Sequence, residues 1–254
     1  FYGYFKLVEQ GVIKEGEEIN VVVPTGNFGN ILASHYAKEM GLPIHKFICA
    51  SNENKVLTDF FQTGTYDKRR ELVLTESPSM DILVSSNLER LLFEACGRNG
   101  EEVKSLMESL NNGGVYKVSE KIASFMNEFY GNYANIDEVY AEIKEMYTKE
   151  GYLMDTHTGV AKVVYNKYKK ETGDDRKVLI ASTASPYKFS SSVLAAIDPE
   201  STGMDEYDMV ERVHQLSNIP VPKSLAELKN KERRFTKVIS KDEMEDFVAE
   251  SLGL

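Results

Sequence analysis

One segment constrains the fold of this chain more than any other, because it joins a buried strand to a helix through a glycine-containing loop. The apolar β-branched run Val21–Val23 stops at a proline, and the loop that follows contains Gly26 and Gly29. A helical pattern then runs over residues 30–40. A strand that leads into a glycine loop and a helix N-terminus offers backbone N–H groups and a positive helix dipole to an anion. We therefore expect a phosphate-binding loop at residues 26–30.

This loop lacks the patterns of the common nucleotide-binding loops. A Walker A loop needs Lys and then Ser or Thr after its last glycine, whereas this chain has Asn30 and Ile31 there. A Rossmann loop needs G-x-G-x-x-G, whereas here a single G-x-x-G is present. The spacing alone fits an ordinary turn between a strand and a helix equally well.

The order of the expected elements indicates an α/β fold with a parallel sheet flanked by helices. Continuously apolar strands, typical of a parallel sheet covered on both faces, are expected at residues 18–23, 45–50 and 178–182. Helices are expected at residues 1–11, 30–40, 58–62, 87–96, 101–110, 119–129, 136–149, 156–170, 190–197, 224–231 and 241–251, and a short extended piece at 72–74. The stretch 101–150 has a helical pattern with a polar break at residues 111–114, which predicts a helical insert there, and a helical tail is expected at about 215–254.

Composition and charge exclude several classes of partner. The chain has 254 residues, a formal net charge of −10 and a pI near 5.1, whereas nucleic acids and anionic membranes bind basic surfaces. No apolar run is long enough to span a bilayer, and no signal peptide is visible. Cys49 and Cys96 have no metal-ligand spacing and suggest no disulfide framework. We therefore expect a cytoplasmic protein that binds no metal, nucleic acid or membrane.

The residues around the glycine loop resemble the cofactor-phosphate loop of the threonine synthases, pyridoxal 5′-phosphate (PLP) enzymes of fold type II with a tryptophan-synthase-β-like fold. The loop reads Pro24-Thr25-Gly26-Asn27-Phe28-Gly29-Asn30. Further matching segments follow in the family's order: Asn52-Glu53-Asn54, Gly64-Thr65-Tyr66, Ser79-Met80-Asp81-Ile82, Ser86-Asn87-Leu88-Glu89-Arg90, Asp155-Thr156-His157-Thr158 and Thr183-Ala184-Ser185-Pro186-Tyr187-Lys188-Phe189. The resemblance runs over nearly the whole chain and implies that residues 1–254 form the larger, C-terminal PLP-binding domain.

The resemblance implies a PLP site made by two loops at one edge of the sheet. The residues expected to hold the cofactor phosphate are Gly26, Asn27, Phe28, Gly29 and Asn30. Thr183 matches the family's neutral hydroxyl partner of the pyridine nitrogen. Lys188 is expected at the same edge, either as a ligand of the substrate phosphate or as a solvated surface lysine.

Other residues of the matching segments have weaker assignments. His157 lies at an expected helix start, where packing beside a capping Asp155 or Thr156 is favoured over chemistry. Many family members have His where Ser185 stands and Ala where Tyr187 stands, so the resemblance implies no role for these two positions. Asn52 and Asn54 follow an expected strand, which favours a place at the edge of the site.

The resemblance also implies that no catalytic residue of the Schiff base lies in this chain. In the family the Schiff-base lysine precedes the phosphate loop, and here only Lys6 and Lys14 precede it, without the expected context. The chain begins at Phe1 within a helical pattern, so we expect an N-terminal domain that carries the lysine as its partner. The implied lyase reaction of the whole enzyme converts O-phosphohomoserine and water to threonine and phosphate, a step of threonine biosynthesis. This chain alone is expected to be inactive.

Two other interpretations stay open. Another PLP enzyme of the same fold, such as a serine dehydratase or a cysteine synthase, needs the same loop. A non-catalytic phosphate-binding module keeps only the loop. The helical pattern over residues 101–150 and the block from Ser79 to Arg90 favour a threonine synthase.

Overall fold

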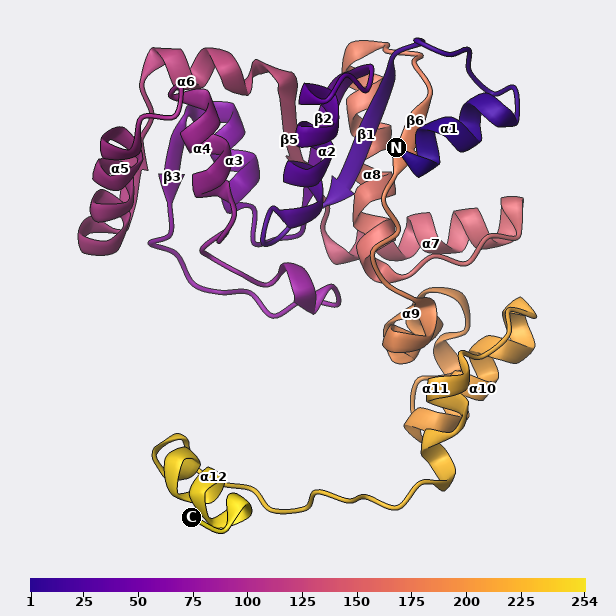
Figure 1. The fold of residues 1–254 in the computed structure, drawn as a ribbon. Helices are drawn as coiled ribbons and strands as arrows, with labels where there is room; N and C mark the ends of the chain where they lie inside the picture. The colour runs from indigo at the N-terminus through magenta and orange to yellow at the C-terminus, as the bar shows by residue number, and fades with distance from the viewer. The chain divides into compact units, whose positions relative to one another are not determined.

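A four-stranded parallel sheet in the order β5-β2-β1-β6 organises the larger part of the chain (Figure 1). The strands of this sheet are β1 (Ile19–Pro24), β2 (Ile44–Ser51), β5 (Phe129–Tyr133) and β6 (Val178–Ile180). A small antiparallel sheet pairs β3 (Thr65–Asp67) with β4 (Val115–Lys117). The computed structural model describes residues 1–254, which divide into two units, Phe1–Asn218 and Ile219–Leu254. Both sheets belong to the first unit, so the expected α/β fold is confirmed.

The helices have the following bounds: α1 Tyr2–Glu9, α2 Gly29–Glu39, α3 Val56–Thr63, α4 Leu88–Ala95, α5 Gly100–Gly113, α6 Glu120–Phe125, α7 Ile136–Glu150, α8 Thr156–Thr172, α9 Ser190–Ile197, α10 Glu206–Ser217, α11 Lys223–Ala226 and α12 Met244–Leu252. Helix α8 packs against β1, β2 and β5, and α7 packs on α8. Helix α2 packs against β1 and β2, and α3 packs against β5.

Helices cover both faces of the parallel sheet. Val21 and Val23 of β1 belong to one hydrophobic cluster with Ile31 of α2. Val22 is fully buried as well, but it lies outside that cluster. Because successive side chains of a strand point to opposite faces, Val22 faces the layer that contains α8. This arrangement explains why the strand is apolar at every position rather than at alternate ones.

The register of the sheet brings two loops to the same edge. Val22 of β1 pairs with Ile48 of β2 and with Ile180 of β6, all in parallel orientation. The carboxyl ends of β1 and β6 therefore meet at one edge, where residues 25–28 and 181–185 begin. Ligands of open α/β sheets bind beyond the carboxyl ends of the strands, so this edge is the first place to look for a site.

The prediction of a purely helical insert at about 101–150 is wrong in two places, because the insert also contains two strands. The expected helix over residues 119–129 ends at Phe125, and Phe129–Tyr133 form β5, an edge strand of the main sheet. Gly131 makes this strand possible, because a Cβ there would lie 3.1 Å from both the Thr58 Cα and the Phe61 Cβ. The second exception is β4, residues 115–117. It pairs with β3, which lies about 50 positions earlier in the chain.

Smaller differences concern element ends and elements that the sequence pattern did not indicate. Helix α5 runs through the polar residues 111–113 and ends at Gly114, which has a φ of +75°. Residues 72–74, expected to be extended, belong to no strand of either sheet. Strand β3 and helix α10 were not expected. No helix in the structure combines the length and the apolar character that crossing a membrane requires.

The second unit, Ile219–Leu254, contains only short helices and no fully buried residue. Ser240 and Glu243 form a capping box before α12: the Ser240 side chain accepts the Glu243 backbone N–H, and the Glu243 side chain accepts the Ser240 backbone N–H. Lys237 pairs with Glu250 at 2.9 Å and lies 4.8 Å from the centre of the Phe247 ring. These surface contacts, rather than an apolar core, order this unit.

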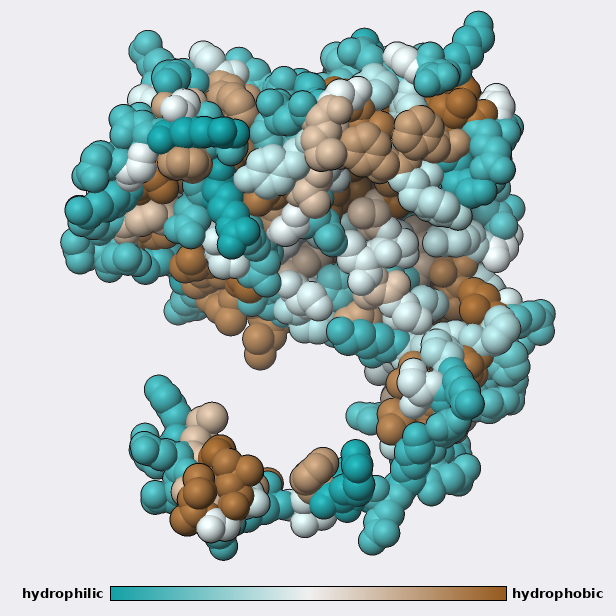
Figure 2. Space-filling model, in the orientation of Figure 1, coloured by the Kyte–Doolittle hydropathy of each residue, from teal (hydrophilic) through white to brown (hydrophobic).

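An apolar groove lies between α1, α2 and the strands beneath them. It has a volume of about 440 Å³, and its lining includes Tyr4, Val21, Ala37 and Leu179. Figure 2 shows apolar side chains gathered at the surface around α1. Two aromatic residues of this segment, Phe1 before α1 and Phe5 within it, are about half exposed, at 49% and 51%. The groove offers no charged side chain for catalysis, so it is not the candidate active site.

His35 in α2 is a buried titratable residue without a hydrogen-bond partner. Its side chain is 1% exposed, and neither ring nitrogen is bonded. Phe47, Phe125 and Phe129 surround the ring at centroid distances of 5.5–6.1 Å. Burial lowers the pKa of His35 below 6.5, against the opposing effect of Glu39 and Glu128. The folded state therefore binds a proton here less readily than the unfolded state does.

We expect this residue to make the protein less stable in acid. A lowered folded-state pKa means that stability is present above pH 6.5 and is lost as pH falls below that value. Replacing His35 with Phe should reduce the loss of unfolding free energy between pH about 7.5 and pH about 5.5. Urea unfolding of both proteins at the two pH values measures this difference. An identical loss in His35→Phe would contradict the assignment.

Candidate functional site

A cleft of about 290 Å³ lies at the carboxyl edge of the sheet, where the register places two loops. Its lining consists of Val23, Pro24, Thr25, Gly26, Asn27, Phe28, Gly29, Asn30, Ser79, Met80, His157, Thr183, Ala184 and Lys188. Every residue predicted for the cofactor or the substrate therefore lines one cleft. Their binding roles stay a prediction, because the lining shows only that they are together. Ser79, Met80 and His157 were not predicted as site residues, although all three belong to segments that resemble the family.

The turn into α2 is held by a buried aromatic ring. Phe28 adopts a left-handed conformation, with φ 63° and ψ 12°, directly before the helix. This conformation costs a residue with a side chain about 1–3 kcal/mol. The Phe28 ring is 1% exposed and stands 6.0 Å from the rings of Phe61 and Phe129. Burial of the ring offsets the backbone strain and fixes the direction in which α2 begins.

The N-terminus of α2 is free of any capping side chain. The first turn of a helix leaves backbone N–H groups without partners inside the helix, and here no side chain accepts from them. Asn27, Gly29 and Asn30 are exposed to the cleft side of the turn. These N–H groups and the positive end of the helix dipole are chemically suited to an anion.

The two glycines of the loop differ in what surrounds them. A Cβ on Gly26 would lie 2.8 Å from the Ser79 carbonyl oxygen and 3.1 Å from the Met80 Cα. Gly26 is therefore required by the close approach of the neighbouring backbone. A Cβ on Gly29 would meet only the Asn87 Nδ2, at 3.8 Å. The space beside Gly29 is open, so this glycine is not required by packing within the chain.

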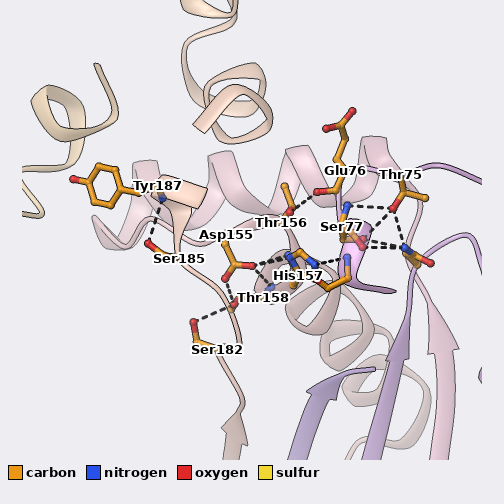
Figure 3. Close-up of polar contacts among 12 residues, drawn as sticks. Thr75, Glu76, Ser77, Asp155, Thr156, His157, Thr158, Ser182, Ser185 and Tyr187 are labelled. Carbon is orange, nitrogen blue, oxygen red and sulfur yellow. Dashed lines mark hydrogen bonds and ion pairs between the residues drawn. The ribbon is translucent and has the colours of Figure 1, made fainter. Parts of the chain in front are cut away.

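The opposite wall of the cleft comes from the loop after β6. Thr183 is exposed, and its hydroxyl makes no hydrogen bond within the chain, so it is available to a ligand. Lys188 is exposed as well, with its Nζ 5.3 Å from the centre of the Phe189 ring. Ser185 has a structural role that the sequence did not suggest, because its Oγ accepts the Tyr187 N–H at 3.3 Å (Figure 3).

His157 joins α8 to the loop that covers Gly26. It is 2% exposed, and its Nε2 accepts the Ser79 N–H at 3.3 Å. Its Nδ1 lies 3.3 Å from an oxygen of Asp155, the residue that caps α8 (Figure 3). An Nε2 that accepts requires the neutral ring with its proton on Nδ1. Both predicted features, the capping Asp155 and the packed His157, are present, and the ring also supports a wall of the cleft.

Asp155 is held in its charged form although it is buried. Burial raises its pKa, but the adjacent His157 ring and the hydrogen bonds from the side chain and backbone of Thr158 outweigh burial and keep the pKa below its ordinary value. The Thr158 hydroxyl gives its one proton to Asp155, so the Ser182 hydroxyl, 3.1 Å away, donates to the Thr158 oxygen. This chain of contacts connects the start of α8 with the end of β6, the two elements on the Thr183 side of the cleft.

Asn52 and Asn54 act one layer behind the site. The Asn52 Nδ2 donates to Asp81 at 2.7 Å and to the Thr75 hydroxyl at 2.8 Å. The Asn54 Nδ2 donates to Asp81 at 3.0 Å and to the Val73 carbonyl at 2.7 Å. Both residues are buried. They anchor the loop that carries Ser79 and Met80 rather than face the cleft, which corrects their predicted place at its edge.

A comparison with known proteins places the chain in a family. The family model described as "Threonine synthase, C-terminal" matches residues 158–248. The solved structure of threonine synthase from yeast aligns with 99% of this chain and 51% of that chain, with a TM-score of 0.81 and 28% identity. The chain belongs to the threonine synthase family. It corresponds to the C-terminal portion of the family's members.

Other members of the threonine synthase family are similar at the level of sequence and structure. Human threonine synthase-like 1 is 44% identical over 196 residues, which are 76% of this chain and 26% of that protein. Threonine synthase of Saccharomyces cerevisiae is 33% identical over 235 residues, which are 86% of this chain and 45% of that protein. The PLP-bound threonine synthase of Brucella melitensis has a TM-score of 0.70 and 33% identity, covering 85% of this chain and 50% of that one. The chain thus spans half or less of the length of these relatives.

The contrast between the two glycines gives a prediction about stability. Gly26→Ala should lower the unfolding free energy by about 1–3 kcal/mol, because a backbone carbonyl occupies the space that its Cβ needs. Gly29→Ala should stay within about 1 kcal/mol of the unaltered protein or exceed it, because Ala favours a helix. Urea unfolding without ligand compares the two variants. Equal destabilisation by both would show that the loop packs differently.

Proposed function

We propose that this chain is the cofactor-binding portion of a threonine synthase, in which the cleft at the start of α2 holds PLP. The observation that carries the proposal is the open space beside Gly29 at an uncapped helix N-terminus. A cofactor phosphate there would accept hydrogen bonds from loop and helix amides without displacing any side chain. When bound, PLP supplies an electron sink that stabilises carbanions.

The remaining lining residues fit the other parts of the same ligand. The free hydroxyl of Thr183 is suited to bond a pyridine nitrogen, and a neutral partner leaves that nitrogen largely unprotonated. The Lys188 ammonium at the mouth of the cleft is suited to the phosphate of an incoming substrate. Ser79 and Met80 close the wall above Gly26 and keep water away from that side. We propose O-phosphohomoserine as the substrate and threonine and phosphate as the products.

We further propose that the lysine needed by the cofactor lies outside residues 1–254 and is supplied by a preceding domain of the same enzyme. Lys188 is the only lysine in the lining of the cleft. The relatives are at least about twice as long as the matched part, which leaves room for such a domain. The domain would cover the exposed side of the cleft. A cytoplasmic location stays a prediction, supported by two reduced, buried cysteines.

One observation favours a second candidate function. The identity with human threonine synthase-like 1, 44%, exceeds the identity with yeast threonine synthase, 33%. Ser185 and Tyr187 also depart from the residues that many threonine synthases have there. An enzyme with the same cofactor site but a different phosphorylated or hydroxylated amino acid substrate fits these facts. Assays of the full-length protein with O-phosphohomoserine, phosphoserine and phosphothreonine separate the two candidates.

Gly29→Val tests the phosphate position. Its Cβ and methyl groups would enter the open space, and PLP affinity should fall about 100-fold, whereas the fold should persist because nothing in the chain occupies that space. Equilibrium dialysis with PLP measures affinity, and circular dichroism checks the fold. Gly100→Val, at the first residue of α5 where the space is also open, controls for the effect of placing valine at a helix start. Unchanged PLP affinity in Gly29→Val would refute the assignment of the cradle.

Thr183→Val tests the pyridine partner in the full-length enzyme. Thr183 makes no hydrogen bond in the chain, so the variant should fold normally and retain most PLP affinity. Turnover should fall about 100-fold, as expected when one positioned hydrogen-bond partner is lost. Thr183→Ser restores a hydroxyl and should restore turnover. Wild-type turnover in Thr183→Val would place the partner elsewhere.

A trapping experiment tests where the lysine lies. The 254-residue chain is mixed with PLP, reduced with borohydride and analysed by mass spectrometry of its peptides. We expect no lysine to be modified stoichiometrically. Stoichiometric modification of Lys188 alone, together with formation of threonine from O-phosphohomoserine, would show that the chain carries its own catalytic lysine.

A further inference from the structure

We propose that Ser85 and Asn87 are positioning residues that turn the amides of the phosphate loop toward the cleft. This inference rests on the proposed PLP site and concerns how its loop acquires its conformation. Neither residue lines the cleft. Both lie at the start of α4, about 60 positions along the chain from the loop that they contact.

Ser85 and Asn87 hold the two consecutive carbonyl groups of the loop. The Ser85 hydroxyl donates to the Gly26 carbonyl oxygen at 2.7 Å. The Asn87 side-chain Nδ2 and the Asn87 backbone N–H both donate to the Asn27 carbonyl oxygen, at 2.8 Å and 3.2 Å. Each carbonyl is therefore fixed on the side of the loop that faces α4.

Peptide geometry carries this constraint to the other side of the loop. In a trans peptide the C=O and the following N–H point in opposite directions. Fixing the Gly26 carbonyl toward Ser85 therefore directs the Asn27 N–H away from α4. Fixing the Asn27 carbonyl does the same for the Phe28 N–H. Both N–H groups belong to residues that line the cleft, and neither donates to another group of the chain.

Asn87 does not cap α4, although its position in sequence favours helix capping. It is the N-cap residue of α4, yet its side chain makes no capping hydrogen bond. Asn99 and Asn135, the N-cap residues of α5 and α7, both cap their helices with their side chains. The side-chain amide of Asn87 instead donates to the phosphate loop, at the Asn27 carbonyl. A purely local helix start does not need this arrangement.

A buried tyrosine supports the same segment from behind. The Tyr66 hydroxyl accepts the Ser85 N–H at 2.8 Å and donates to the Leu83 carbonyl at 3.1 Å. Tyr66 is 2% exposed and stacks on Tyr116 at 5.3 Å. Burial raises the pKa of Tyr66 to about 12, so its hydroxyl keeps the proton that it donates. The segment from Leu83 to Asn87 is thereby anchored in the core on the side away from the loop.

The test separates anion affinity from stability with matched asparagines. Asn87→Ala should weaken binding of inorganic phosphate and of PLP about 10-fold, since it frees the Asn27 carbonyl to turn. Asn99→Ala removes a working cap and should lower the urea midpoint of unfolding without changing either affinity. Ser85→Ala should weaken binding in the same direction as Asn87→Ala, and Ser85→Thr, which keeps the hydroxyl, should restore it. Ser86→Ala removes only a long contact, 3.5 Å, with the Asn27 side-chain oxygen and none with a loop carbonyl, so it should leave both affinities unchanged.

Calorimetric titration with phosphate gives the affinities, and amide chemical shifts give an independent readout. In the unaltered protein the Asn27 and Phe28 amides should shift most on addition of phosphate, and in Asn87→Ala these two shifts should shrink. If the unaltered protein binds and Asn87→Ala binds equally well, the positioning role is wrong and the proposed site stands. If the unaltered protein shows no saturable binding of phosphate or PLP, the proposed site is wrong, and the positioning role falls with it.

Discussion

The parallel pairing of β1 with β2 and β6 is the constraint on which the candidate site depends. It brings the carboxyl end of β1 beside that of β6, so that a loop near residue 26 and a loop near residue 183 share one cleft. These loops are separated by most of the chain, and no local contact between them is needed. The hydrophobic effect drives this pairing, because Val21, Val22 and Val23 are all buried between two layers of helices.

Around this frame, polar contacts determine how each wall of the cleft is placed. Asp155 and His157 tie α8 to Ser79, and Asn52 and Asn54 tie the same loop to the end of β2 through Asp81. Most of these groups are buried, and a buried polar group that loses its partner is costly. A change in any one of them therefore affects the position of the loop that closes over Gly26. Except for His157, the side chains that support the candidate site in this way do not line its cleft.

The strand-loop-helix unit and the grouping of Gly26–Asn30 with Thr183 and Lys188 could be predicted from the sequence, because strand periodicity and the parallel order define the edge of the sheet. Strand β5 could not, since the residues before it have helical spacing and its place depends on a close approach to Gly131. The left-handed turn at Phe28 also could not be predicted, because this conformation favours glycine. Its strain is offset by burial of the Phe28 ring against residues distant in sequence. For Asn87, local propensity indicated a helix cap. Its side chain instead donates to the carbonyl of Asn27, a residue distant in sequence.

The ring of Phe28 makes the geometry of the loop depend on β5. That ring rests against Phe61 and Phe129, and Phe129 is the first residue of the edge strand. The backbone that lines the cleft is thus attached, through one side chain, to a strand about 100 positions later in the chain. If the cleft holds PLP as proposed, a genetic screen for weakened PLP binding should recover substitutions in β5 as well as in the loop. Growth of these β5 mutants should be restored by extra cofactor precursor in the medium. Weakened binding can be overcome in this way, whereas the loss of a catalytic group cannot.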